Sequence, residues 1–304
     1  MDFGTLNMST LAEEIPMFES ILQAIITGVL IGVIYALITL GLSVIFGTMN
    51  VVNFAHGDFV MLSMYLSYAI GMFLLWDAVA TPLITVPLLF AFGYFIYYLL
   101  IDRTLRQSFV VQLAVTVGLS ILMRSLALMI WKGQSVAFQS SIITGNFEIG
   151  GITILTSRLV SAIVSILFII ALTYFLNKTW AGAAMRAASD DLDAASLMGV
   201  NYHRTYALTF AIGSAITAVA GGLLMTFQQT DALGGMRFGT LSWCILSLAG
   251  WGSIPGLLIS GVIVGVAESL AITYIDPRSG LVAVYLIFIL VLWLRPRGLF
   301  GRKF

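Results

Sequence analysis

The sequence predicts an all-α fold: a polytopic membrane protein with eight to nine transmembrane helices, some of them broken or re-entrant. Two observations on composition and one on pattern predict it. Of the 304 residues, 60% are hydrophobic and only 9% are charged, whereas soluble domains carry about 25% charged residues. The apolar residues also gather in long runs. An ordinary core cannot absorb this much apolar sequence, so we expect residues 1–304 to form a single transmembrane domain surrounded by membrane lipid.

The apolar runs define the expected helices, because a helix needs about 20 apolar residues to cross the hydrocarbon core of a bilayer. Eight runs have suitable length and hydropathy: Ile21–Phe46, Phe59–Leu75, Pro82–Ile101, Phe109–Trp131, Leu159–Leu176, Tyr206–Phe227, Leu257–Ile275 and Leu281–Leu294. A ninth run, Phe238–Gly250, is short. It fits either a thin crossing or a re-entrant half-helix.

Lys and Arg indicate which loops face the cytoplasm. They gather in three regions, marked by Arg103 and Arg106, by Lys178, Arg186 and Arg204, and by Arg295, Arg297, Arg302 and Lys303. If all three regions are cytoplasmic, the N-terminus and Asn146 lie outside and nine crossings are needed. If the ninth run is re-entrant, the chain crosses the membrane eight times. Both termini then lie on the same side, so either the N-terminus or the C-terminus must be on the side opposite to the one given above. The acidic start, with Asp2, Glu13 and Glu14 and no Lys or Arg, is unlike a secretory signal and is expected in the mature protein.

Composition also limits the chemistry. The formal net charge of zero argues against nucleic acid as a partner. Cys244 is the lone cysteine and permits no internal disulfide. His56 and His203 are the two histidines, and no metal-ligand spacing or nucleophile accompanies them. We therefore predict no metal, no cofactor and no catalytic site.

The stretch NVVNFAHGD follows the first span without a long soluble loop and places polar groups next to an apolar run. Gly57 can open a helix at low cost. Polar backbone at membrane depth survives only where it is buried in protein or lines a cavity. We therefore predict a broken helix start in which Asn50, Asn53, His56, Gly57 and Asp58 line or brace a substrate pathway. An interfacial loop with capping Asn and Asp side chains fits the same residues.

A second interruption lies in LAGWGSIPGLLISGVIVGVAESL. The residues that break the helix are Gly250, Gly252, Pro255 and Gly256. Gly252/Gly256 and Gly261/Gly265 both have the G-x-x-x-G spacing, which lets helices approach closely. Paired interruptions in the two halves of a transporter point to its pathway, although tight helix packing without a substrate role also explains them.

Two ionisable residues lie inside the apolar runs. Glu268 follows the second interruption and is a candidate pathway residue. A structural ion pair or a side chain that snorkels to the surface also fits it. Arg124 lies about two turns from the outer end of its span. The same two interpretations fit it, and we favour snorkelling.

The longest polar segment between spans is the cytoplasmic loop 179–204. Its alanine-rich sequence predicts short helices, and Ser189 and Asp190 are suited to a helix start. Gly199 is suited to a helix end. A small helix over Asp190–Gly199 with an apolar face fits a rigid docking element, and it also fits a plain surface helix that joins two spans.

Here the chain resembles a known family. DAASLMG looks like the EAA-x-x-x-G coupling loop of ABC-importer permeases, with Asp193 in place of the usual Glu. The whole chain is similar to the branched-chain amino acid permease subunits of bacterial ABC importers. NFAHGD, RAASDDLDAASLMGV, ALTFAIGSAITAVAGGLL, GSIPG and RPRGLFG all match that family's pattern, in order, between about Leu22 and Gly301. The family often carries Glu where this chain has Asp58, a departure that bears on the solute.

The resemblance implies the rest of an importer in the bacterial inner membrane: a second homologous permease subunit, two cytoplasmic ATPase subunits and a periplasmic solute-binding protein. The residues that it implies for ATPase coupling are Arg186, Asp190, Asp193, Ala194, Ala195 and Gly199. The chain has no G-x-x-x-x-G-K-[ST] phosphate loop, which agrees with ATP binding by separate subunits.

The expected function is thus solute transport without catalysis by this chain. The solute is a branched-chain amino acid or a related small polar molecule, with urea and short amides as the main rivals. An ion-coupled secondary transporter that uses Asp58 and Glu268 is an alternative of a different class. An intramembrane enzyme using His56 and Asp58 is the weakest, because nothing in the sequence completes its site.

Overall fold

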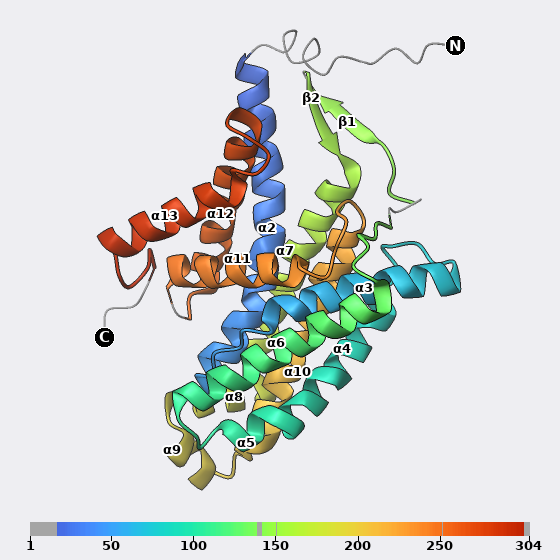
Figure 1. Ribbon diagram of the computed structural model, residues 1–304. Helices are drawn as coiled ribbons and strands as arrows, with labels where there is room; N and C mark the ends of the chain where they lie inside the picture. Colours follow the sequence, from blue (N-terminus) through green and yellow to red (C-terminus); the bar gives the residue numbers. More distant parts are fainter. Residues whose placement is uncertain (1–16, 139–141, 150, 251, 301–304) are drawn as a thin grey trace.

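The computed structural model describes residues 17–138, 142–149, 151–250 and 252–300. Over these residues the chain is mostly helical (Figure 1). In chain order the elements are α2 (Met17–Met49), α3 (His56–Leu74), α4 (Pro82–Ile96), a π-helical turn (Tyr97–Ile101), α5 (Asp102–Thr104), α6 (Phe109–Trp131), β1 (Asn146–Ile149), β2 (Ile152–Leu155), α7 (Thr156–Lys178), α8 (Trp180–Asp190), α9 (Leu192–Leu197), α10 (Tyr202–Met225), α11 (Gly234–Ala249), α12 (Ile254–Tyr274) and α13 (Gly280–Leu294).

Judged by length and hydropathy, fewer helices can cross the membrane than the sequence predicted. Seven described helices are long and apolar enough to cross a bilayer: α2, α3, α4 with its π-helical extension, α6, α7, α10 and α12. Helix α13 is apolar but has only 15 residues. Helix α11 has 16 residues and lies across α2 in Figure 1. The chain is therefore a polytopic membrane protein, and the predicted count of eight to nine spans is not confirmed.

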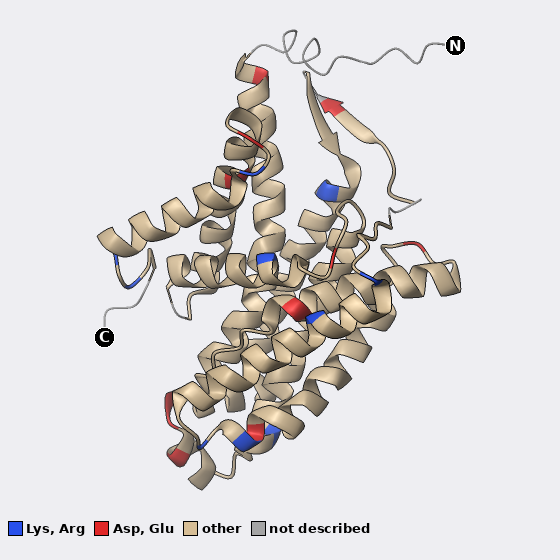
Figure 2. Cartoon of the chain, in the orientation of Figure 1, with Lys and Arg blue, Asp and Glu red and all other residues tan. Residues whose placement is uncertain are grey.

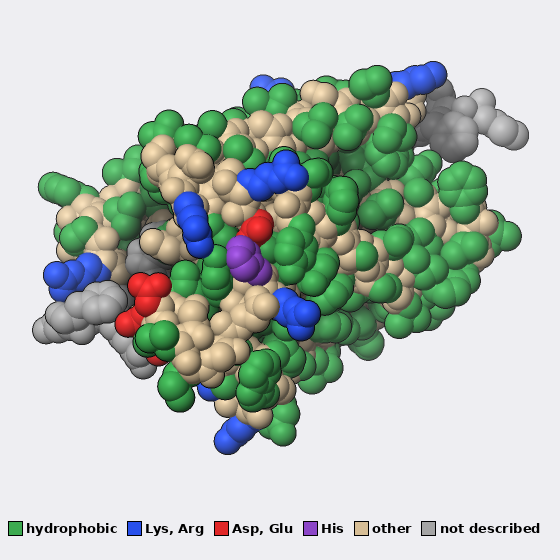
Figure 3. All heavy atoms as spheres, turned by 90° about the horizontal axis from the view of Figure 1, so that it is seen from below, with side chains coloured by type: hydrophobic (Ala, Val, Ile, Leu, Met, Phe, Trp, Pro, Cys, Tyr) green, Lys and Arg blue, Asp and Glu red, His purple; other side chains and the backbone are tan. Residues whose placement is uncertain are grey.

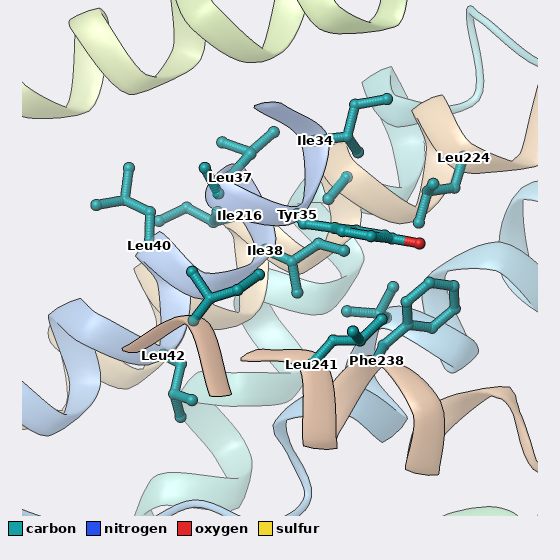
Figure 4. Packing of buried hydrophobic residues seen from close by; sticks show 14 of the residues in the cluster. Ile34, Tyr35, Leu37, Ile38, Leu40, Leu42, Ile216, Leu224, Phe238 and Leu241 are labelled. Carbon is teal, nitrogen blue, oxygen red and sulfur yellow. The ribbon is translucent and has the colours of Figure 1, made fainter. Parts of the chain in front are cut away.

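Helix α2 is the central element. Its 33 residues make it about 50 Å long at 1.5 Å per residue, which is longer than a hydrocarbon core of about 30 Å. It contacts α12, α10, α7 and α11. Figure 4 shows its apolar side chains meeting Leu224 of α10 and Phe238 of α11. By contrast, α6 and α7 leave most of their surface exposed, as helices that face lipid do.

Small residues explain why α2 and α12 lie so close together. Gly28 and Gly32 of α2 face Gly265 and Gly261 of α12, and a methyl group added at any of the four would collide with the facing backbone. The predicted close approach at Gly261/Gly265 is confirmed. This contact depends on van der Waals packing between backbones, which is how small residues associate helices in lipid.

The second interruption is a turn between α11 and α12. Gly250 and Gly252 have φ angles of 80° and 78°, which L side chains rarely adopt. The Ser253 hydroxyl then caps α12 by accepting a hydrogen bond from the Gly256 amide at 3.1 Å. Pro255 fits the first turn of α12 because its missing N–H has no partner there. The interpretation of Gly252/Gly256 as a helix-packing pair is wrong, since Gly252 precedes the helix and has open space around it.

The C-terminal motif RPRGLF is anchored to the end of α11. The amides of Leu299 and Phe300 donate to the carbonyls of Leu248 and Ala249 at 2.7 and 3.2 Å. Gly298 is required at the contact, because a side chain there would collide with the backbone of Gly250. The turn after α11 is thus held both by the cap of α12 and by the C-terminal motif.

One feature departs from the all-α prediction. Residues Asn146–Ile149 and Ile152–Leu155 form an antiparallel hairpin. Gln23 of α2 ties it down with two hydrogen bonds to the Thr153 backbone, at 2.6 and 2.8 Å. The hairpin lies at the same end of the molecule as the start of α2, opposite α8 and α9 (Figure 1).

Charged residues are sparse along the helices, and several lie around α5, α8 and α9 at one end (Figure 2). This end holds two of the three regions predicted to be cytoplasmic, around α5 and around α8 and α9, and the hairpin with Asn146 lies at the other. The third region follows α13 and does not lie at the α8–α9 end (Figure 1). Which end faces the cytoplasm stays a prediction. Asp2, Glu13, Glu14, Arg302 and Lys303 lie outside the described residues.

Candidate functional site

The polar stretch after α2 is an irregular segment of six residues. Helix α2 ends at Met49 and α3 begins at His56. Asn50 leaves α2 with φ of 52°, a left-handed conformation that Asn tolerates. The buried Asn53 side chain accepts a hydrogen bond from the Ala55 amide at 3.1 Å, which forms a local turn. The turn is therefore held by the buried Asn53 side chain, whereas Asn50 is exposed.

His56 is buried and bonded to α2. Its Nε2 lies 2.9 Å from the carbonyl oxygen of Ile38. Asp58 is two residues away but has other partners, so the break does not join the two side chains. No group of three His, Cys, Asp or Glu residues that could hold a metal occurs in the described part of the chain.

Asp58 forms an ion pair with Arg124, a partner that the sequence analysis did not identify. Arg124 of α6 donates from Nε to the Asp58 carboxylate at 2.8 Å, and the Ser120 hydroxyl donates to it as well. Asp58 is fully buried, and the Arg124 side chain is 25% exposed. The interpretation of Arg124 as a snorkelling residue is wrong, because a carboxylate inside the protein holds it. Position alone cannot reveal such a pairing, since 66 residues separate the partners.

Gly57 lets α3 contact α11. A side chain at Gly57 would collide with the backbone of Gly235 and Gly239. A side chain at Gly235 would collide with Asp58. These glycines bring the amino end of α11 directly against the buried carboxylate of Asp58.

Glu268 lies in a second polar centre. It is buried and accepts a hydrogen bond from Arg237 of α11 at 2.7 Å. The pair forms part of the wall of a pocket of about 660 Å³ between α2, α7, α11 and α12. Arg158 lies on the same wall, with its guanidinium carbon 5.4 Å from the centre of the Phe227 ring. Glu268 thus makes the structural ion pair that the sequence allowed and also lines a cavity.

The sequence analysis did not single out Arg158 and Arg237 as site residues. Each lies near the start of an apolar helix, where a surface position is the ordinary expectation. A weak signal was present, because few cations occur in the predicted outer loops. The residues predicted for the pathway and the helix break fall in three places: the α2–α3 segment, the Glu268 pocket, and the turn at Gly250, Gly252, Pro255 and Gly256, which does not line that pocket.

The predicted coupling helix is shorter than expected and has a helix before it. Asp190 is the last residue of α8, and Asp191 is the residue that caps α9, accepting a hydrogen bond from the Ala194 amide at 2.9 Å. The predicted start at Asp190 is therefore wrong by two residues, because the chain between α8 and α9 turns sharply at Asp191. Gly199 ends the segment with φ of 87°, as predicted for a glycine stop.

Helix α9 presents an apolar tip to the outside. Leu197 and Met198 are 88% and 86% exposed, whereas Ala195 is buried against the protein. The other predicted coupling residues, Arg186, Asp193 and Ala194, are exposed on α8 and α9. Figure 3 shows this end of the molecule, where charged, histidine and apolar side chains mix.

A second pocket, also of about 660 Å³, separates α9 from the α5–α6 loop. Asp102 and His203 line it and lie 2.5 Å apart, from carboxylate oxygen to Nδ1. Arg106 donates to the Tyr202 hydroxyl at 3.3 Å across the same region. These bonds link α5 and the α5–α6 loop to the start of α10, directly beside the exposed helix α9.

Comparisons with known proteins give the family. A sequence model described as "Branched-chain amino acid transport system / permease component" matches residues 24–292. The chain is 34% identical over 298 residues to the high-affinity branched-chain amino acid transport system permease protein LivH of Salmonella typhimurium, covering 94% of this chain and 97% of that protein. It is 30% identical to the corresponding protein BraD of Pseudomonas aeruginosa, covering 92% and 96%.

A more distant relative is the fructose import permease protein FrcC of Rhizobium meliloti, 28% identical over 183 residues, which cover 54% of this chain and 49% of that protein. No solved structure matched the chain significantly. Because the match to the family covers nearly the whole length, the chain belongs to the branched-chain amino acid permease family of ABC importers.

Proposed function

We propose that this chain forms half of the membrane pathway of an ABC importer for branched-chain amino acids, in a bacterial inner membrane. The observation that carries the proposal is the 34% identity to LivH over 97% of that protein. The match to the fructose permease is weaker and covers about half of each chain. The solute assignment therefore follows the relatives that share the whole chain.

The other half of the pathway is a second homologous permease subunit, and two ATPase subunits and a periplasmic solute-binding protein complete the importer. Residues 1–304 act as one membrane domain, with the loop 179–204 as its coupling element. The exposed tip of α9, Leu197 and Met198, supports an ATPase contact, because a cytoplasmic loop gains little from exposing two large adjacent apolar side chains without a partner.

Coupling depends on how α8 and α9 connect to the spans. Helix α8 contacts α2, α7 and α10, and the Ser189 hydroxyl donates to the Gly47 carbonyl at the end of α2 at 2.5 Å. A push on α9 therefore reaches the central helix through α8. Such a force would rock α2 and α10 between outward-open and inward-open arrangements, as alternating access requires.

In this scheme the two polar centres have different roles. Asp58, Arg124 and Ser120 brace the broken start of α3, because the fully buried Asp58 carboxylate is bonded to both of the other side chains. Asn50, Asn53, His56 and Gly57 shape the same break. The pocket at Glu268 is open to solute-sized molecules and is the proposed pathway.

The decisive experiment reconstitutes this chain with its cognate permease, ATPase and binding-protein subunits. Liposomes are loaded with ATP on the ATPase side, and uptake of radiolabelled leucine and urea is compared. We expect leucine uptake that requires both ATP and the binding protein. Urea uptake without leucine uptake would assign the solute to the rival class. Leucine uptake driven by a proton or sodium gradient without ATP would show a secondary transporter.

A further inference from the structure

Within the described part of the chain, the Glu268 pocket contains a cation, Arg158, that forms no ion pair with a carboxylate. Among the residues that the structure describes there are three ion pairs, and they use Arg124, His203 and Arg237. Arg237 is the cation nearest to Glu268 and is committed to it at 2.7 Å. Arg158 takes part in none of these pairs, although it lines the same pocket.

The residues around Arg158 fix the position of its side chain but leave a hydrogen-bond donor without an acceptor. One face of the guanidinium group lies over the Phe227 ring, a cation–π contact that fixes its position. Its Nε atom is buried and has no hydrogen-bond partner in the described part of the chain. The Nε atom of Arg237 is in the same condition. Buried donors without acceptors are rare in native proteins, and each calls for an explanation.

The other groups in the pocket complement an amino acid. A zwitterion brings a carboxylate, an ammonium group and, for leucine, an aliphatic side chain. A guanidinium fork binds a carboxylate through two parallel hydrogen bonds. The carboxylates of Glu268 and Asp231 line the same cavity and suit an ammonium group. Ile31, Phe238 and Ile272 supply apolar wall, and about 660 Å³ is ample for one small solute.

We propose that Arg158 binds the carboxylate of the transported amino acid in this pocket, and that it is the residue by which the permease itself recognises an α-amino acid. This inference rests on the proposed solute class. It gives the permease a solute site of its own, after release from the binding protein. An uncharged solute such as urea needs no free cation at this position.

The test uses the complete importer in liposomes, with leucine-loaded binding protein at saturating concentration. The quantity measured is the number of leucine molecules imported per ATP hydrolysed. Three variants are compared: Arg158→Gln, Arg158→Lys, and Arg278→Gln as the matched control. Arg278 is an exposed arginine in the loop after α12 and lies outside the pocket. Thermal melting of each purified complex reports folding.

We expect Arg158→Gln to lower the transport ratio at least tenfold while ATP hydrolysis continues. Arg158→Lys keeps the charge and should fall between Gln and wild type, and Arg278→Gln should match wild type. An unchanged ratio in Arg158→Gln, or equal losses for Lys and Gln, would overturn the inference. If the wild-type importer carries urea and no amino acid, the proposed function fails, and the inference fails with it. If the wild-type importer carries leucine and Arg158→Gln imports as many leucine molecules per ATP as wild type, the inference is wrong and the proposed function stands.

A second measurement covers the case in which Arg158→Gln does not assemble. Binding of tritiated leucine to the detergent-purified wild-type permease–ATPase complex is competed with unlabelled leucine and with isoamylamine, which is leucine without its carboxylate. We expect isoamylamine to compete at least tenfold more weakly. Equal competition, or no leucine binding at all, contradicts the inference.

Discussion

Asp58 at the start of α3 and Arg124, about two turns before the end of α6, form an ion pair inside the membrane domain, with Nε and the carboxylate oxygen 2.8 Å apart. The carboxylate is fully buried. Lipid offers it no partner, and an ionised carboxylate at a helix centre costs about 2.5–3.5 kcal/mol even on the lenient insertion scale. Arg124 and Ser120 offset this cost, and in doing so they fix α6 beside the break that starts α3.

The first prediction concerns this pair. Removing one partner of a buried pair costs about 3–5 kcal/mol, whereas replacing both by apolar residues is often close to neutral. We therefore expect Arg124→Leu and Asp58→Leu each to lower the melting temperature of the purified complex and to abolish uptake. The double variant Asp58→Leu/Arg124→Leu should regain most of the melting temperature.

Asp58→Asn separates shape from charge at the same position. It keeps the size of the side chain and one acceptor for Ser120, so partial uptake is expected. Wild-type uptake in both Asp58→Asn and Asp58→Leu would show that the segment is an ordinary loop with no bracing function. Loss of uptake in the double variant despite a restored melting temperature would indicate that the charge itself is needed for transport.

A structural feature of this chain could be predicted from the sequence where neighbouring residues cause it. The irregular start of α3 was predictable, because Asn53 and Gly57 express local backbone preferences. So were the glycine stop at Gly199 and the close approach at Gly261 and Gly265. The cap at Asp191 was missed by one residue, since Ser189, Asp190 and Asp191 are all suited to capping and only the fold chooses among them.

The pairings could not be predicted. Asp58 meets Arg124 across 66 residues, and Arg237 meets Glu268 across 31. Each charge alone is compatible with snorkelling, and the partner is set by how α6 and α11 pack. The short hairpin Asn146–Leu155 was missed for a related reason: it lies in the loop between two predicted spans, and the two hydrogen bonds with Gln23 that hold it come from a distant helix.

The second prediction tests the contact between α3 and α11. Gly57→Ala places a methyl group against the backbone of Gly235 and Gly239, and backbone cannot move aside as a flexible side chain can. Overpacking of this kind typically costs about 1–3 kcal/mol, so the melting temperature and the uptake rate should both fall. Gly47→Ala is the matched control, because Gly47 lies in a helix with open space around it, where alanine is favoured by up to about 1 kcal/mol. Equal melting temperatures in the two variants would contradict the packing assigned to Gly57.

The third prediction concerns sidedness. A single cysteine at position 146 should react with a membrane-impermeant maleimide from outside intact cells, whereas cysteines at 103, 186 and 302 should react only after the membrane is opened. The background is Cys244→Ala, and the native Cys244 is buried, so its removal disturbs no surface. Labelling of position 146 only from the cytoplasmic side would reverse the orientation.

The last prediction concerns α9 and the ATPase. Its exposed tip contributes little to the stability of the isolated chain, because Leu197 is 88% exposed. Leu197→Asp should therefore leave membrane insertion and melting temperature unchanged and yet reduce copurification with the ATPase and ATP-driven uptake. At Gly199 the φ of 87° disfavours side chains other than Asn. Gly199→Arg should thus abolish uptake by adding bulk and strain beside the tip, while Gly199→Asn retains a substantial part. Normal uptake by Gly199→Arg, or full copurification of Leu197→Asp, would show that the ATPase docks elsewhere, since neither change could be accommodated in a tight helix-in-groove contact.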